Sequence, residues 1–259
     1  MKINKKSVRQ LDDFLLEKDK YYLLLFITSF GFSFLYSDLE SYLMGRIDNK
    51  LPIWIWCRDN LSDEKLLELY SDLDNLLVSG KNEITCSKYL YNKLIDRYNI
   101  SDYFEVGYLT CYEPIMPKDT GDIVVAVKDD RDSLFKYFKD NNRESDNFEL
   151  NDQENYRELD GYISNHSLYL LKDSNNNILS MCAYTLLDNM AKLTRVYTPK
   201  EYRRNGYCEW LVYNITSGLI ELGYKVILYT KHNYIPSMSA YKKIGYVEED
   251  VLITFNINK

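Results

Sequence analysis

Short apolar runs and segments with helical periodicity alternate in a regular order over residues 123–257. Runs of period-two alternation are typical of strands, whereas apolar residues three and four apart are typical of helices. The elements predicted here are a strand at 123–127, helices at 132–139 and 151–163, strands at 167–171, 178–187 and 191–198, a helix at 201–222, a strand at 225–229, a helix at 237–244 and a strand at 247–257. Gly223 and Gly245 are placed to end two helices, because glycine takes the left-handed conformation at little cost. This order predicts an α+β fold, mixed α/β, with a central mixed sheet flanked by helices.

The first 120 residues show a less regular pattern and carry no motif with a recognisable chemistry. The elements predicted here are helices at 7–16, 61–78 and 87–98 and strand-like runs at 53–57 and 103–112. Turn-forming residues at 117–121 follow and place a domain boundary at residue 120. We therefore predict an N-terminal α/β companion domain over 1–120 and a second domain over 121–259. Three roles stay open for the companion domain: packing on the second domain, shaping its substrate pocket, or forming a homodimer.

One uncharged run, residues 21–36, is long enough to be compared with a membrane segment. As a helix its 16 residues would span about 24 Å, whereas a bilayer core is about 30 Å thick. The basic residues 1–6 lead into a charged amphipathic segment rather than into an apolar signal core. We therefore expect residues 21–36 to be buried in a core, and we expect a cytoplasmic protein with no membrane partner.

Charge and cysteine content disfavour several other classes of protein. The formal net charge of -7 argues against a nucleic-acid partner, because contacts to phosphate backbones need a basic surface. The five cysteines are widely spaced and form no C-x-x-C pair, and only two histidines accompany them. This content predicts neither a disulfide framework nor a metal site. Any site for an anion is then expected to be local.

The strongest local signal follows the strand at 191–198, where a basic loop leads into a long helix. The first amides of a helix have no partner within it, and the helix dipole adds positive potential, so such a bend attracts anions. Arg203 and Arg204 add charge, while Gly206 permits close approach of the backbone. Cys208 keeps the first helical turn small, and neither the dinucleotide-binding nor the Walker glycine pattern is present. We interpret this bend as a pyrophosphate site, with an ordinary basic helix N-terminus as the alternative.

Residues 196–208, VYTPKEYRRNGYC, resemble motif A of the GNAT superfamily of acetyl-CoA-dependent N-acetyltransferases. They are similar to the VYTPPEYRGKGYA form that is seen in one subgroup. Downstream, residues 227–230, ILYT, and 241–246, YKKIGY, resemble the LYTD and IYxxIGF segments of that subgroup. The resemblance covers residues 121–259. It implies a GNAT-like sheet with acetyl-CoA as co-substrate and no metal.

The resemblance also implies which residues bind acetyl-CoA. The backbone at the strand end would pair with the pantetheine arm as an added strand, and the bend would hold the pyrophosphate through its amides. The implied cofactor-binding residues are Val196, Tyr197, Thr198, Arg203, Arg204, Asn205, Gly206, Tyr207, Cys208, Glu209, Asn233 and Ser237. The chain departs from the subgroup downstream, because the expected asparagine falls on Tyr234, one place after Asn233, and the aspartate of LYTD is Lys231.

Tyr241 is the catalytic acid that the resemblance implies, since a tyrosine in this segment often protonates the departing CoA thiolate in the family. Tyrosine is common in this chain, with 25 of 259 residues, so a packing role for Tyr241 is the alternative. The sequence identifies no general base. His232 has a suitable intrinsic pKa, but a solvated surface histidine is the competing interpretation.

An acidic segment at 144–160 carries seven acids and a single basic residue, Arg157. The acids are Glu144, Asp146, Glu149, Asp152, Glu154, Glu158 and Asp160. In GNAT folds the connection between the first two helices borders the acceptor pocket, so this segment would attract a cationic amine; a solvated acidic face is the alternative. The leading hypothesis is an N-acetyltransferase that acts on a primary amine of a small molecule or peptide. The alternative is a catalytically weak acyl-CoA-binding module that acts through a protein partner.

Overall fold

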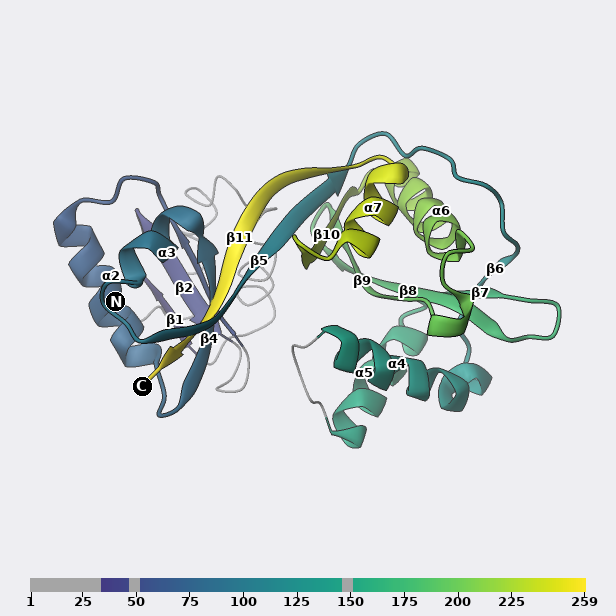
Figure 1. Cartoon of the computed structure of the whole chain (residues 1–259), viewed down its shortest axis with the longest axis horizontal. Helices are drawn as coiled ribbons and strands as arrows, with labels where there is room; N and C mark the ends of the chain where they lie inside the picture. The colour runs from purple at the N-terminus through teal and green to yellow at the C-terminus, as the bar shows by residue number, and fades with distance from the viewer. Residues whose placement is uncertain (1–33, 47–51, 146–150) are drawn as a thin grey trace. The chain divides into compact units, whose positions relative to one another are not determined.

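The computed structural model describes residues 34–46, 52–145 and 151–259, whose secondary structure is shown in Figure 1. These residues form two compact units. The first unit contains the described residues up to Tyr108 together with Thr230–Asn233 and Glu248–Lys259, and the second contains Leu109–Tyr229 and Tyr234–Val247. The functional division at residue 120 stays a prediction.

The first unit is built on a sheet with two helices. Its strands are β1 (Phe34–Ser37), β2 (Tyr42–Arg46), β3 (Ile53–Cys57), β4 (Lys81–Ser87), β5 (Ile100–Cys111) and β11 (Tyr246–Asn258), in the spatial order β1-β2-β3-β4-β11-β5. Its helices are α2 (Asp63–Leu76) and α3 (Lys88–Leu94). Because α2 crosses from β3 to β4, these two strands are parallel, and Leu69 and Leu73 of α2 are fully buried in the core of this unit.

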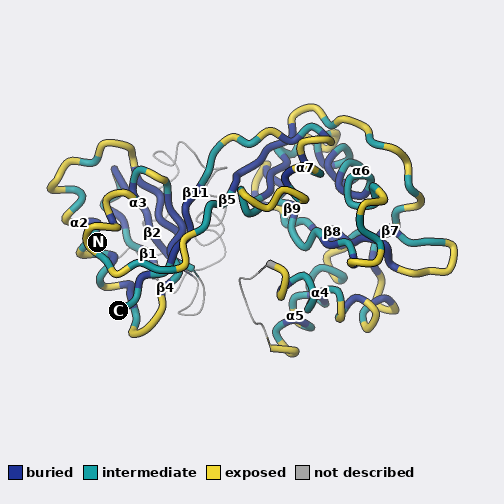
Figure 2. The backbone as a smooth tube through the Cα atoms, in the orientation of Figure 1, coloured by how far each residue is buried: buried dark blue, intermediate teal, exposed yellow. Residues whose placement is uncertain are grey.

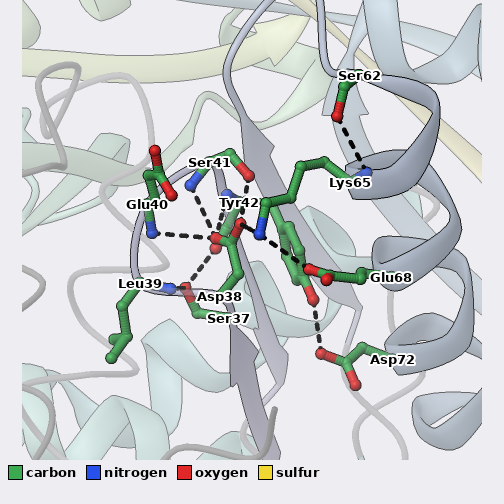
Figure 3. A network of polar contacts seen from close by, with 10 residues as sticks. All are labelled: Ser37, Asp38, Leu39, Glu40, Ser41, Tyr42, Ser62, Lys65, Glu68 and Asp72. Atoms are coloured by element: carbon green, nitrogen blue, oxygen red, sulfur yellow. Dashed lines mark hydrogen bonds and ion pairs between the residues drawn. The ribbon is translucent and has the colours of Figure 1, made fainter.

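The turn between β1 and β2 is held by Asp38, whose contacts are drawn in Figure 3. Its carboxylate accepts hydrogen bonds from the amides of Glu40 at 3.0 Å, Ser41 at 2.8 Å and Tyr42 at 3.2 Å, and it pairs with Lys65 of α2 at 3.2 Å. Burial alone would raise the pKa of Asp38, but the hydrogen bonds from Ser41 and the neighbouring amides lower it well below its usual value. The turn is thereby fixed to α2.

In the second unit the strand order is β5-β10-β9-β8-β7-β6. Its own strands are β6 (Ile123–Val125), β7 (Leu168–Lys172), β8 (Ile178–Leu187), β9 (Met190–Tyr197) and β10 (Lys225–Lys231). Its helices are α4 (Arg131–Ser145), α5 (Asp152–Ser164), α6 (Tyr207–Glu221) and α7 (Ile235–Lys243), with short 3₁₀ turns η2 (Lys128–Asp130) and η3 (Lys200–Tyr202). β6 to β9 are antiparallel neighbours, whereas β9 and β10 are parallel because α6 connects them.

Helices cover both faces of the sheet in the second unit, with α4 and α5 on one face and α6 and α7 on the other (Figure 1). Phe138 and Leu159 fill the core under α4 and α5. Leu211 and Val212 of α6 pack in a second core with Leu193 of β9. Both cores are buried in Figure 2, so the strands between them present main-chain groups only along their edges and ends.

The fold class predicted from the sequence is confirmed, and so are the helix stops at Gly223 and Gly245, which have φ of 88° and 98°. The helix predicted to start at residue 201 instead starts at Tyr207. Arg204 and Gly206 have φ of 65° and 82°, a left-handed backbone that no α-helix accommodates. The strand predicted at 103–112 is also found, as β5. Its place in the sheet, between β11 and β10, was not predicted.

Several predictions fall outside the described residues. These are the amphipathic helix at 7–16, most of the uncharged run at 21–36, and the acids Asp146 and Glu149. Among the described residues, no helix is long and apolar enough to cross a membrane.

Candidate functional site

A gap opens between the parallel strands β9 and β10. Their register pairs are Met190 with Lys225, Ala191 with Val226 and Lys192 with Ile227. Beyond Lys192 and Ile227 the structure shows no further pairing between the described residues of these two strands. The edge of residues 193–197 that faces away from β8 therefore has no strand neighbour. Main-chain donors and acceptors on such an edge are open to pairing with an extended ligand.

A β-bulge in β9 explains why the strands separate. Thr194 is paired with Ala183 of β8, but the next pair joins Tyr197 to Met181, so β9 has one residue more than β8 over this stretch. Arg195, inside the bulge, has a left-handed φ of 53°. A bulge bends its strand and increases the local twist, which turns the end of β9 away from β10.

The bend after β9 leads into the N-terminus of α6. Gly206 is the N-cap residue, its carbonyl accepts from the Trp210 amide at 3.0 Å, and no side chain caps the helix. The amides of Tyr207, Cys208 and Glu209 consequently have no partner within the helix. Because the positive end of the helix dipole lies at the same place, this end attracts an anion.

The two arginines of the bend have different surroundings. The Arg203 Nε donates to the Thr198 carbonyl at 2.9 Å, and its guanidinium pairs with Glu144 of α4 at 2.6 Å. Arg204 is exposed at the surface. The half-buried side chain of Arg203 thus braces the bend, and Arg204 is left to supply charge to a bound anion. The sequence pattern did not distinguish these two roles.

Other side chains brace the same bend. The Asn205 side-chain amide donates to the carbonyls of Tyr202 at 3.0 Å and Arg203 at 3.2 Å. The Ser180 hydroxyl of β8 donates to the Tyr197 carbonyl at 3.2 Å and lies 3.0 Å from the Thr198 hydroxyl. The bend is therefore fixed by side-chain contacts, which pre-organise its amides.

Tyr241 lies on α7, buried in the core under α6. Its ring packs against Tyr246 with centroids 5.8 Å apart, and its hydroxyl makes no hydrogen bond to another described residue. Burial, followed by the proximity of Cys208 and Cys182, raises the pKa of Tyr241 well above its usual value. The side chain is thus a neutral phenol with a proton to donate. Burial also raises the pKa of the Cys208 thiol to about 12.

The remaining predicted residues lie around the start of α7. Ser237 is in the first turn of α7, four residues before Tyr241 and hence on the same side of that helix. Asn233 is exposed, and so is Tyr234, which occupies the place of the family's asparagine. His232 belongs to the first unit, where its Nδ1 lies 2.6 Å from the Glu248 carboxylate.

Sequence reasoning missed a polar cluster under β9. Arg195 forms a bidentate ion pair with Glu158 of α5, and Asn142 of α4 donates to Asn155 at 2.6 Å. A mid-strand arginine gave no signal, because its left-handed φ and its partners depend on tertiary contacts.

A cavity of about 280 Å³ lies nearby, between α4 and η3, with Tyr137 and Tyr197 in its wall. In the described part of the chain, no group of histidine, cysteine and acidic residues is arranged to hold a metal ion.

Comparison with known proteins identifies relatives of this fold. Residues 174–253 match the model of the family described as FR47-like protein. A GNAT-family acetyltransferase structure from Colwellia psychrerythraea aligns with a TM-score of 0.64 at 14% identity, covering 100% of this chain and 99% of the other. A GCN5-related N-acetyltransferase from Sphaerobacter thermophilus aligns with a TM-score of 0.69 at 10% identity, covering 99% and 94%. The C-terminal half therefore has the fold of these GNAT structures, and we call it the GNAT-type domain.

The GNAT-type domain was predicted from residues 196–208, and that prediction is confirmed. A third structure, a GCN5-related N-acetyltransferase from Kribbella flavida, aligns with a TM-score of 0.61 at 10% identity, covering 98% of this chain and 96% of the other. At these identities the alignments establish the fold. Comparison with curated proteins gives no significant match.

Proposed function

We propose that the GNAT-type domain is an N-acetyltransferase that moves an acetyl group from acetyl-CoA to a primary amine of a small molecule or peptide. The observation that carries this proposal is the end of β9–β10 pairing at Lys192 and Ile227, followed along the chain by the uncapped N-terminus of α6. An open strand edge suits the amides of a pantetheine arm, and helix amides suit a pyrophosphate. The open edge and the helix N-terminus follow one another along the chain. Acetyl-CoA carries a pantetheine arm next to a pyrophosphate, so it needs both features close together.

The residues assigned to acetyl-CoA divide between these two features. Val196, Tyr197 and Thr198 offer main-chain groups to the pantetheine arm, with Ser237 of α7 and Asn233 as the side-chain contacts that the family resemblance implies. Arg204, Asn205, Gly206, Tyr207, Cys208 and Glu209 supply the amides and the positive potential for the pyrophosphate. Arg203 supports that binding indirectly, because it holds Thr198 and Glu144 together.

Catalysis would begin with attack of the neutral amine nitrogen on the thioester carbonyl. A main-chain amide of β9 at the open edge stabilises the oxygen as it gains negative charge. As the carbon–sulfur bond breaks, Tyr241 donates its proton to the leaving sulfur and recovers one from solvent. Water carries away the proton that the amine loses.

Proton donation from a phenol to a thiolate is uphill in water, by roughly 1.5 pKa units, because ordinary phenols have a pKa near 10 and thiols near 8.5. Burial raises the pKa of both partners: that of Tyr241 well above its usual value, and that of the neighbouring Cys208 thiol to about 12. A CoA sulfur that leaves into the same surroundings becomes a stronger base while the phenol becomes a weaker acid, so burial alone does not reverse the difference. A difference of roughly 1.5 pKa units corresponds to about 2 kcal/mol, a small part of an enzymatic barrier.

The cavity between α4 and η3 is the candidate site for the acceptor amine. Tyr197, which lines it, is also one of the strand residues assigned to the pantetheine arm. Its wall carries three acidic residues, Asp140, Glu144 and Glu201, and three basic ones, Lys136, Arg143 and Lys200. The cavity therefore offers carboxylate partners to an amine without a net negative charge.

The test is CoA release from acetyl-CoA, followed with a thiol reagent across a panel of small amines and peptides. Saturable CoA production with at least one amine supports the enzyme. The second candidate is an acyl-CoA-binding module without turnover, which is favoured by Tyr234 at the position where the family has asparagine. Tight acetyl-CoA binding with no CoA release from any amine would support the module. Absence of binding would contradict both.

A further inference from the structure

Arg195 is held in an unusual position on β9. Its φ of 53° lies in the left-handed region, which costs a residue other than glycine roughly 1–2 kcal/mol. Such a conformation persists only where the surroundings enforce it. The surroundings here are side chains of α4 and α5, so the bulge that bends β9 is supported from the opposite face of the sheet to α6.

The guanidinium of Arg195 is clamped by two helices. Its Nε donates to one Glu158 carboxylate oxygen at 3.0 Å, and an NH₂ group donates to the other. The remaining NH₂ group donates to the side-chain carbonyl of Asn142. Arg195 is mostly buried, with 14% of its side chain exposed, against 30% for Glu158. A bidentate pair with so little solvent contact fixes orientation as well as position.

The next residue of the bulge is held from the same side. The Asn141 side-chain amide donates to the Val196 carbonyl at 3.4 Å. Asn142 is itself fixed by its hydrogen bond to the buried Asn155. The Arg195 side chain and the peptide group between Val196 and Tyr197 are thus both held by contacts with α4 and α5.

We propose that Arg195 is a positioning residue, which, held by Glu158 and Asn142, aims a main-chain amide of the bulge at the thioester oxygen. This inference rests on the proposed acetyltransferase function. The side chain touches neither acetyl-CoA nor the amine and acts through the backbone alone. Oxyanion stabilisation depends on donors placed to within tenths of an ångström, so a loosened bulge slows the chemistry more than it weakens cofactor binding.

The test compares Glu158→Gln and Arg195→Gly with wild type. Glutamine keeps the shape of Glu158 without its charge, and glycine adopts the left-handed φ without strain but cannot form the clamp. We expect kcat to fall by about 10- to 100-fold, with the Kd for acetyl-CoA, measured by calorimetry, changed by less than about 3-fold.

A matched control is Asp160→Asn. Asp160 binds Arg131 in a similar bidentate pair, at 2.9 Å for the second contact, but this pair joins α4 and α5 without reaching β9. We expect Asp160→Asn to lower the melting temperature while kcat stays within about 3-fold of wild type.

Three outcomes would overturn the proposal. If Glu158→Gln loses no more kcat than Asp160→Asn, the clamp serves stability alone. If the Kd for acetyl-CoA rises in parallel with the loss of kcat, the bulge serves binding rather than chemistry. If wild-type protein binds no acetyl-CoA, the proposed function fails first and this inference with it. Should Arg195→Gly not fold, Glu158→Gln alone decides.

Discussion

Lys192 of β9 and Ile227 of β10 are the last paired residues of two parallel strands that continue for several residues beyond them. The separation has a local cause, because the bulge that follows Thr194 turns β9 away from its neighbour. Buried strand edges normally have their hydrogen bonds satisfied, so an edge left open inside a sheet points to a ligand that completes it. The proposed acetyltransferase activity depends on that opening.

Gly206→Val is expected to reduce strongly the stabilisation of the protein by acetyl-CoA. A Cβ at this position would make only an ordinary 3.6 Å contact with Thr120, but the φ of 82° disfavours any side chain. Strain of roughly 1–2 kcal/mol would distort the bend and lower acetyl-CoA affinity by about 10-fold or more. Thermal melts with and without acetyl-CoA measure the effect.

Gly223→Val is the matched control for this substitution. Gly223 has a similar φ of 88°, has no neighbouring atom within 4 Å of an added Cβ, and lies at the opposite end of α6. It should lose similar stability and keep the full acetyl-CoA shift. If acetyl-CoA raises the melting temperature by the same amount in both variants and in wild type, the bend is not part of the binding site.

Tyr241→Phe is expected to lower kcat by roughly 100-fold while leaving the Kd for acetyl-CoA unchanged. Because burial raises the pKa of Tyr241 above its usual value, the phenol keeps its proton and should cause no loss of kcat between about pH 8 and 10. Steady-state kinetics over this range checks both points. Tyr246→Phe, which removes a buried hydroxyl bonded to Thr216 at 2.7 Å, should keep kcat within a few fold. If Tyr241→Phe turns over at the wild-type rate, Tyr241 is not the acid that protonates the leaving sulfur.

Arg203→Ala and Arg204→Ala should have opposite consequences. Arg203 joins the Thr198 carbonyl to Glu144, so its loss should lower the free energy of unfolding by roughly 1–2 kcal/mol. Exposed Arg204 should leave stability unchanged, while its loss raises the Kd for acetyl-CoA a few fold, and less so at high salt. Denaturant unfolding and calorimetry at two ionic strengths measure the pair. Identical behaviour of the two variants would contradict the division of roles described here.

Lys192 gives a prediction for pH. Burial lowers its pKa from 10.5 to about 8, despite the opposing effect of Glu158. Between about pH 8 and 10.5 the unfolded chain binds a proton that the folded protein does not, so this residue makes stability rise with pH.

Lys192→Met removes that titration. Wild type gains stability from Lys192 as the pH rises, and the variant does not. The free energy of unfolding of the variant should therefore fall relative to that of wild type by roughly 1–3 kcal/mol as the pH rises from 7 to 10. Urea unfolding at several pH values gives the difference curve. A curve that is flat across this range would show that Lys192 titrates normally.

The sequence predicted the parts of this site that depend on local backbone chemistry. A basic loop with Gly206 ahead of a long apolar helix specifies a bend whose amides face outward, and the structure shows Gly206 as the N-cap of α6. Gly223 and Gly245 end their helices for the same local reason. Such features need only the propensities of a few neighbouring residues.

Features that depend on distant contacts were not predicted. β5 pairs beside β10 although more than a hundred residues separate them, and no turn or periodicity signals that insertion. The partner of Arg203 is Glu144 of α4, and the partner of Arg195 is Glu158 of α5. In each case the decisive partner lies on another element, which residue spacing does not reveal.

A crystal structure with bound CoA tests the central claim most directly. We predict that the pantetheine arm lies between β9 and β10 beyond Lys192 and Ile227, with the pyrophosphate oxygens within about 3 Å of the Tyr207, Cys208 and Glu209 amides. A structure in which those strands pair along their full length, or in which CoA binds elsewhere, would contradict the account.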